Sequence, residues 1–156
     1  MFTANEILDI AIRLEKNGEN IYRRAIEKIA MPELASALEW VADEEVRHAK
    51  WFSDLKRNTA GQSIGMSVEE IGPDFLGSVI GEQSFSLQGI DFTSIDQVSE
   101  LLDIFIEFEN DGILFYEMLL PFIRSESARE LLETIIAEER EHIKVLKERI
   151  AELAKT

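Results

Sequence analysis

The stretch EEVRHAK at residues 44–50 decides the fold, because a second version of it, EEREHIK, stands at residues 138–144. Each version contains Glu-x-x-His, and these motifs hold the only two histidines of the chain. Each is also preceded, 30 residues earlier, by a Glu-x-x-Gly-x-x-x-Tyr pattern. All five positions recur at a constant spacing of 94 residues, as the pairs Glu15 and Glu109, Gly18 and Gly112, Tyr22 and Tyr116, Glu45 and Glu139, and His48 and His142. The chain is therefore interpreted as a duplicated helical unit.

Helix-start patterns predict four long helices and an all-α fold. Capping patterns open the first and third helices, TANE at residues 3–6 and SIDQ at residues 94–97, and Pro32 suits the first turn of the second. The fourth helix is expected to follow Ser127 or to begin a residue or two earlier. The four predicted helices span residues 3–30, 32–58, 94 to about 121–124, and 127–155.

Short turns join the first helix to the second and the third to the fourth, which makes each pair an antiparallel hairpin. Between the hairpins, residues 59–93 hold six of the eight glycines. This segment is predicted to be a long crossover, with one short helix near residues 67–80, that lets the second and third helices run parallel. We therefore expect one domain over residues 1–156, a four-helix bundle of two duplicated hairpins, 3–58 and 94–155.

Four glutamates interrupt the apolar stripes that face the centre of this bundle, at matching depth. Four buried carboxylates repel one another and cost several kcal/mol unless cations compensate them. Two divalent cations would balance their charge, and carboxylates with imidazoles form the ligand set of di-iron and di-manganese carboxylate bundles. The predicted metal ligands are Glu15, Glu45, His48, Glu109, Glu139 and His142.

The other repeated residues allow two interpretations each. Gly18 and Gly112 serve either close helix packing or space beside the metals. Tyr22 and Tyr116, the only tyrosines, are either core aromatics or hydroxyl donors to a ligand carboxylate. No residue beyond the metal ligands is predicted to be catalytic.

Residues around the ligands are less symmetric than the ligands themselves. Glu44 and Glu138 match in the repeat but lie off the histidine face, so they are predicted either to support the ligands from outside the ligand set or to be surface acids. Trp40 and Trp51 flank the predicted site on the second helix only. We therefore expect unequal surroundings for two matched sets of ligands.

Composition excludes several classes of function. The chain has 156 residues, 46% of them hydrophobic and 30% charged, which fits one globular domain. The absence of cysteine excludes disulfides, thiolate metal sites and iron–sulfur clusters. A net charge of −15 disfavours nucleic acid and anionic membranes as partners. No signal peptide or membrane span is visible in the sequence, which favours a cytoplasmic location.

At the repeated residues the chain resembles the rubrerythrin branch of the ferritin-like superfamily. The resemblance implies a ferritin-like bundle, bridging roles for Glu45 and Glu139, and terminal roles for the other four ligands. It also implies two iron ions, with manganese or a mixed pair compatible, an external electron donor, and peroxide or dioxygen as substrate. The favoured function is accordingly a di-iron oxidoreductase.

Two departures from the family accompany the resemblance. Rubrerythrins usually carry a cysteine-rich rubredoxin domain, which this cysteine-free sequence lacks. They also carry an extra glutamate one turn after the residue that matches Glu109, where this chain has Gly112. A ferroxidase or iron-handling protein, and a non-enzymatic metal-binding module, are the alternatives. The sequence leaves the oligomeric state open, a homodimer included.

Overall fold

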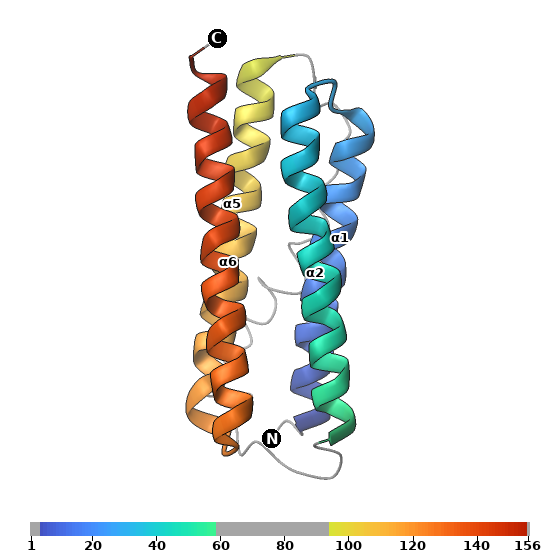
Figure 1. The fold of residues 1–156 in the computed structure, drawn as a ribbon, viewed down its shortest axis with the longest axis vertical. Coiled ribbons are helices and arrows are strands. Elements are labelled where there is room, and N and C mark those ends of the chain that lie inside the picture. The colour runs from blue at the N-terminus through green and yellow to red at the C-terminus, as the bar shows by residue number, and fades with distance from the viewer. Residues whose placement is uncertain (1–3, 59–93, 156) are drawn as a thin grey trace.

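The computed structural model describes residues 4–58 and 94–155, and Figure 1 shows their arrangement. In these two ranges the chain contains helices and no strand, which confirms the all-α prediction. The elements are α1 (Ala4–Lys28), α2 (Pro32–Asn58), α5 (Ile95–Leu119), the short 3₁₀ helix η1 (Leu120–Phe122) and α6 (Glu126–Leu153). The predicted crossover at 59–93 and its short helix near 67–80 lie outside the described residues, as does Thr3 of the first capping pattern.

Helix ends follow local chemistry. The backbone N–H of Gln97 donates to the Ser94 side chain at 3.5 Å, so the predicted cap of α5 is present. The cap of α6 is Ser125, whose side chain accepts from the Ala128 N–H at 3.3 Å. Ser127 therefore lies inside the first turn, and the earlier of the two predicted starts is correct. On the other side of the same turn, α5 stops at Leu119, earlier than predicted.

Proline explains that early stop. Pro121 has no N–H to donate to the carbonyl one turn before it, so the α-helical pattern cannot continue through it. The chain tightens instead into η1, in which Pro121 occupies the beginning of the 3₁₀ helix. The third predicted helix thus covers the expected residues, but it is α-helical only to Leu119 and continues as a 3₁₀ helix to Phe122.

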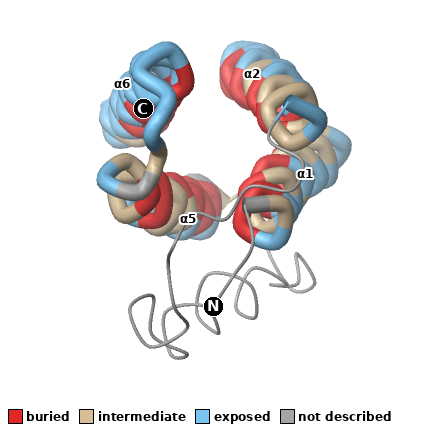
Figure 2. Tube along the Cα trace, turned by 90° about the horizontal axis from the view of Figure 1, so that it is seen from below, coloured by how far each residue is buried: buried red, intermediate tan, exposed pale blue. Residues whose placement is uncertain are grey.

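The helices form two antiparallel hairpins that pack face to face. α1 lies along α2 and α5 along α6, while α2 contacts α6 and α1 contacts α5 across the bundle. Figure 1 shows that α2 and α5, although diagonal to each other, run in the same direction, as the predicted crossover requires. The buried faces of all four helices point to the middle of the bundle in Figure 2.

Apolar side chains fill the bundle at both ends and leave a charged layer between them. Large fully buried residues such as Leu38, Phe52, Leu102, Phe105 and Leu132 form this core. Their spacing follows the stripes expected of bundle helices. No helix in the described ranges is long and apolar enough to cross a membrane.

Candidate metal centre

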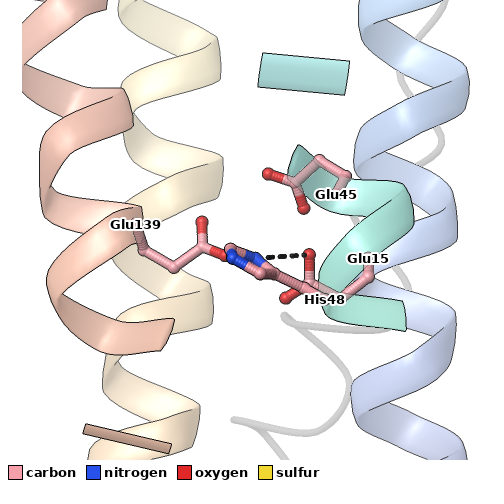
Figure 3. A group of neighbouring side chains, drawn as sticks. All are labelled: Glu15, Glu45, His48 and Glu139. Carbon is pink, nitrogen blue, oxygen red and sulfur yellow. Dashed lines mark hydrogen bonds and ion pairs between the residues drawn. The ribbon is translucent and has the colours of Figure 1, made fainter. Parts of the chain in front are cut away.

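The six predicted ligands meet in the middle of the bundle. α1 carries Glu15, α5 carries Glu109, and α2 and α6 each carry one Glu-x-x-His motif. The side chains are 0–3% exposed, and they are the only buried polar or charged residues, tyrosine aside, in the ranges that the structure describes. Figure 3 shows four of them, Glu15, Glu45, His48 and Glu139, converging from three helices.

Their donor atoms form two overlapping groups. In each group one donor atom from each of four residues lies within 4.8 Å of the others. One group contains Glu15 and His48, the other contains Glu109 and His142, and both contain Glu45 and Glu139. Two ions held by these groups would share the last two carboxylates, which is the bridging arrangement that the resemblance to rubrerythrins implies. That the six residues bind metal stays a prediction.

The His48 half is tightly contacted. Its Nδ1 lies 2.7 Å from Glu139 Oε1 and 3.5 Å from Glu15 Oε2. Glu15 Oε2 is nevertheless buried without a hydrogen-bond partner, as is Glu45 Oε1. Buried acceptors without partners destabilise a fold, and a cation at this point would satisfy them.

The His142 half is more loosely contacted. Its Nδ1 lies 3.2 Å from Glu45 Oε1, 3.2 Å from Glu139 Oε2 and 3.6 Å from Glu109 Oε2. Neither ring nitrogen makes a hydrogen bond, although the ring is fully buried. The unpartnered carboxylate oxygens and imidazole nitrogens are the donor types that iron and manganese accept, so the residues fit a pair of these ions.

Burial and mutual repulsion divide the four carboxyl groups into two kinds. Burial, followed by repulsion from the other carboxylates, raises the pKa of Glu45 and that of Glu139 well above the usual value. Burial also opposes ionisation of Glu15 and Glu109, but hydrogen bonds and the nearby imidazoles outweigh it. The pKa of Glu15 is therefore lowered, and that of Glu109 falls to about 2.

The imidazoles are shifted in the opposite sense. Burial disfavours the charged rings, but contacts with the carboxylates outweigh it and raise the pKa of His48 to about 11 and that of His142 to about 10. Two imidazolium ions thus balance the ionised Glu15 and Glu109, while protons neutralise the two shared carboxyl groups. Two divalent cations would replace these four protons without changing the net charge of the layer.

Each tyrosine reaches across the bundle to the glutamate of the other hairpin. The Tyr22 hydroxyl donates to Glu109 Oε1 at 2.5 Å, and the Tyr116 hydroxyl donates to Glu15 Oε1. Burial, together with the neighbouring carboxylates, raises the pKa of both phenols well above 10. Both therefore stay protonated and fix the orientation of the two unshared carboxylates.

The two repeated glycines have different surroundings. A Cβ on Gly18 would lie 3.1 Å from Glu45 Oε2 and 3.1 Å from the Phe108 ring, so this glycine permits close packing. A Cβ on Gly112 would meet nothing within 4 Å. A cavity of about 10 Å³, room for about one water molecule, adjoins Gly112 and is lined by all four glutamates, Leu14, Phe108 and Tyr116. Gly18 thus fits the close-packing interpretation, and Gly112 fits the interpretation that a glycine leaves space beside the metals.

The sequence left open which acid outside the ligand set would contact a histidine. Glu138, predicted to lie off the histidine face, approaches the second ring nitrogen of His48 to 2.7 Å from the opposite hairpin. Its match in the repeat, Glu44, makes no such contact with His142 and bonds to Arg47 instead. The Glu-Glu pair that begins both motifs was the visible pattern, but the choice of partner depends on how α2 and α6 face each other.

Comparison with known proteins supports the fold. The family model named Rubrerythrin matches residues 6–76, which include Glu15, Glu45 and His48. A crystal structure from Thermotoga maritima, described as a candidate ferritin-like di-iron-carboxylate protein, superposes with a TM-score of 0.70 at 25% identity and covers 97% of this chain and 96% of its own. A hypothetical protein from Pyrococcus furiosus superposes with a TM-score of 0.76 at 22% identity, with 99% and 92% covered.

No curated protein matches the chain. The two solved structures confirm the predicted four-helix bundle, which the first description calls ferritin-like, and the family match over residues 6–76 supports the resemblance to rubrerythrins.

Proposed function

We propose that this chain, a rubrerythrin-like protein of the ferritin-like superfamily, is a di-iron carboxylate oxidoreductase that reduces hydrogen peroxide or dioxygen. The observation that carries the proposal is the pair of four-residue donor groups that share Glu45 and Glu139 inside the buried core. In this assignment the shared glutamates bridge the ions, and Glu15 with His48 and Glu109 with His142 are the terminal ligands.

Iron in this centre would supply the redox chemistry that the chain's own side chains lack. When bound, two Fe(II) ions supply two electrons, and a peroxide that accepts them with two protons is cleaved to two water molecules. An external donor must return the electrons, and its class is left open by the residues described. Manganese, or a mixed pair, fits the same ligands.

The protein's part is to bind, orient and exclude water. Tyr22 and Tyr116 hold the unshared carboxylates from across the bundle. The apolar layers on both sides keep the centre away from bulk solvent. The cavity beside Gly112 admits a small molecule next to the carboxylates. This combination suits a small substrate such as hydrogen peroxide or dioxygen better than a large organic one.

The test is the reactivity of the reduced, metal-loaded protein. We expect peroxide to remove the Fe(II) state quickly, and turnover to continue while a reductant is supplied. The matched control is the doubly substituted Glu45→Gln, Glu139→Gln protein, treated with the same iron. If peroxide leaves the Fe(II) of the wild-type centre unchanged for minutes, the proposal is wrong.

Iron handling is the second candidate, favoured by a net charge of −15 that would gather cations. It predicts oxidation of many iron ions per chain, and storage would need a large closed assembly. Sedimentation that finds only monomers or dimers excludes storage. A purely structural metal pair instead predicts no turnover and a large loss of stability on chelation.

A further inference from the structure

The two imidazoles of the centre are held differently on their outer side. His48 Nε2 lies 2.7 Å from Glu138 Oε2, so this ring has a carboxylate partner on the nitrogen that faces away from the other ligands. His142 Nε2 is buried and has no hydrogen-bond partner among the residues that the structure describes. The nearby aromatic group is Trp40, whose ring stands 5.3 Å from the His142 ring at 83°. On its outer side, the His48 ring is therefore held by the Glu138 carboxylate, whereas the His142 ring is held by packing alone.

Arg47 completes the anchored side. One of its terminal nitrogens lies 2.7 Å from Glu138 Oε2, and the same side chain bonds to Glu44. Glu44, Glu138 and His48 gather within 4.8 Å, so both outer glutamates stand on the His48 side. The residue that matches Arg47 in the second hairpin is Glu141, which cannot play the same part. The difference between the two histidines therefore follows from a difference in sequence between the two hairpins.

A carboxylate on the outer nitrogen has a defined effect on a metal-binding imidazole. It holds the proton on Nε2, leaves the Nδ1 lone pair for the ion and stops the ring from rotating. His48 Nδ1 already points at Glu139 and Glu15, so the anchored ring is in position before an ion arrives. His142 must settle into place when its ion binds, and that ordering reduces affinity.

We propose that Glu138, held by Arg47, positions His48, and that the metal position of Glu15, Glu45, His48 and Glu139 consequently fills before the position that contains His142. Glu138 is a positioning residue in this scheme. The inference rests on the metal-binding part of the proposed function and is independent of its redox chemistry, so the peroxide experiment and the binding experiment fail separately.

The experiment is a stepwise titration of the metal-free full chain with Mn(II) alone. Calorimetry gives the two binding constants, and electron paramagnetic resonance separates chains with one isolated ion from chains with a coupled pair. For the wild type we expect two unequal steps, with the isolated-ion spectrum dominant at one equivalent. Two equal steps, or the coupled spectrum from the first addition onward, would overturn the proposed order.

Substitutions then identify the anchored half. Glu138→Gln should weaken the first step by about 10- to 100-fold, the usual loss when a histidine's outer partner is removed, and bring the two steps together. Glu44→Gln is the matched control, because Glu44 is the repeat equivalent, has a comparable exposure of 21% against 29%, and also contacts Arg47. It should weaken the first step far less than Glu138→Gln does, because the hydrogen bond to His48 comes from Glu138. Equal losses in the two variants would mean a general charge effect, and the proposal would be wrong.

A double-mutant cycle shows whether Glu138 acts through His48. In a His48→Ala background, Glu138→Gln should cause no further loss, because the ring that it positions is gone. An undiminished loss in that background would overturn the positioning role. Arg47→Ala gives a second route: it should weaken only the first step, and by less than Glu138→Gln. Thermal unfolding of each metal-free variant checks that the bundle is intact.

A wild-type chain that binds no Mn(II) and no Fe(II) would overturn the metal centre itself and this inference with it. A wild type that binds two ions in two steps, with Glu138→Gln indistinguishable from it, would overturn the inference alone.

Discussion

The two hairpins carry the same predicted ligands at matching positions, but the side chains that pack around these ligands differ between the hairpins. In the first hairpin, Gly18 is covered by Phe108 and by the carboxylate of Glu45. In the second, no atom of the described residues lies within 4 Å of the position that a Cβ on Gly112 would take, and the residue that matches Phe108 is the shorter Leu14. The side chains that would bind ions are preserved in both copies, and the side chains around them have diverged.

This difference shows how a site built from two duplicated halves can be more accessible from one side than from the other. If the two halves bind similar ions, equal ligands suffice, whereas the proposed small substrate would need access from one side only. Phe108 closes the Gly18 side, and the cavity lies on the Gly112 side. The anchoring of His48 by Glu138 adds a second inequality between the halves. The predicted ligands are thus arranged almost symmetrically, while the residues that surround them are not.

The largest expected effect comes from removing both shared carboxylates. Glu45→Gln together with Glu139→Gln should abolish binding of two metals while leaving a folded bundle. The raised pKa of both groups means that the metal-free fold favours their neutral form, which glutamine imitates permanently. The metal-free double variant should therefore gain stability over the wild type as pH rises. Metal analysis after dialysis and thermal unfolding measure the two effects, and two tightly bound ions per chain would refute the bridging assignment.

The next effect concerns pH and distinguishes the empty centre from the loaded one. His48 and His142 have pKa values of about 11 and about 10 in the metal-free fold, against 6.5 ordinarily. Their contribution to stability is complete below about pH 6.5 and is lost as pH rises toward 10 and 11. The melting temperature of the metal-free chain should fall between pH 7 and pH 9.

The loaded chain is the control for that measurement. Bound ions hold the imidazoles unprotonated, so the loaded chain should not share this loss, and metal affinity should rise with pH because binding displaces protons. A metal-free melting temperature that rises over the same range would contradict the assignment of the two imidazolium ions.

The two tyrosines test a feature that the hairpins share, the hydrogen bond from each tyrosine to the glutamate of the other hairpin. Tyr22→Phe and Tyr116→Phe each remove a buried hydrogen bond to a carboxylate of the other hairpin. Each should cost about 1.5–3 kcal/mol in the free energy of unfolding of the metal-free chain, the range for hydrogen bonds to charged groups. Urea denaturation of both variants measures this. A large cost in one and none in the other would show that the crossed contacts are not equivalent.

The buried cluster of six glutamate and histidine side chains could be predicted from sequence because such a residue on an apolar stripe has few roles, and finding each twice removes most alternatives. The helices followed from caps and spacing, although Ser125 rather than Ser127 caps α6. Contacts between hairpins could not be predicted, since spacing along one helix does not fix how two helices face each other. Glu138 reaching His48, and Phe108 covering Gly18, belong to this class.

The smallest expected effect is also the most direct test of the unequal enclosure, because it makes the same change in both halves. Gly112→Ala adds a Cβ where nothing lies within 4 Å, so it should stabilise the metal-free chain by up to about 1 kcal/mol through helix propensity. Gly18→Ala places its Cβ 3.1 Å from both Phe108 and Glu45 Oε2, so crowding of about 1–3 kcal/mol should cancel or exceed the same gain.

Urea denaturation of the two metal-free variants gives the signs, and Mn(II) titration adds a second comparison. Gly18→Ala presses on a shared carboxylate and should weaken the binding of both ions, while Gly112→Ala should leave both binding constants near those of the wild type. A larger residue at the open position, as in Gly112→Val, should slow the reaction with peroxide, because it fills the cavity beside the carboxylates. If the two alanine variants change stability by the same amount and in the same direction, the two halves are enclosed alike, and the open side assigned to Gly112 does not exist.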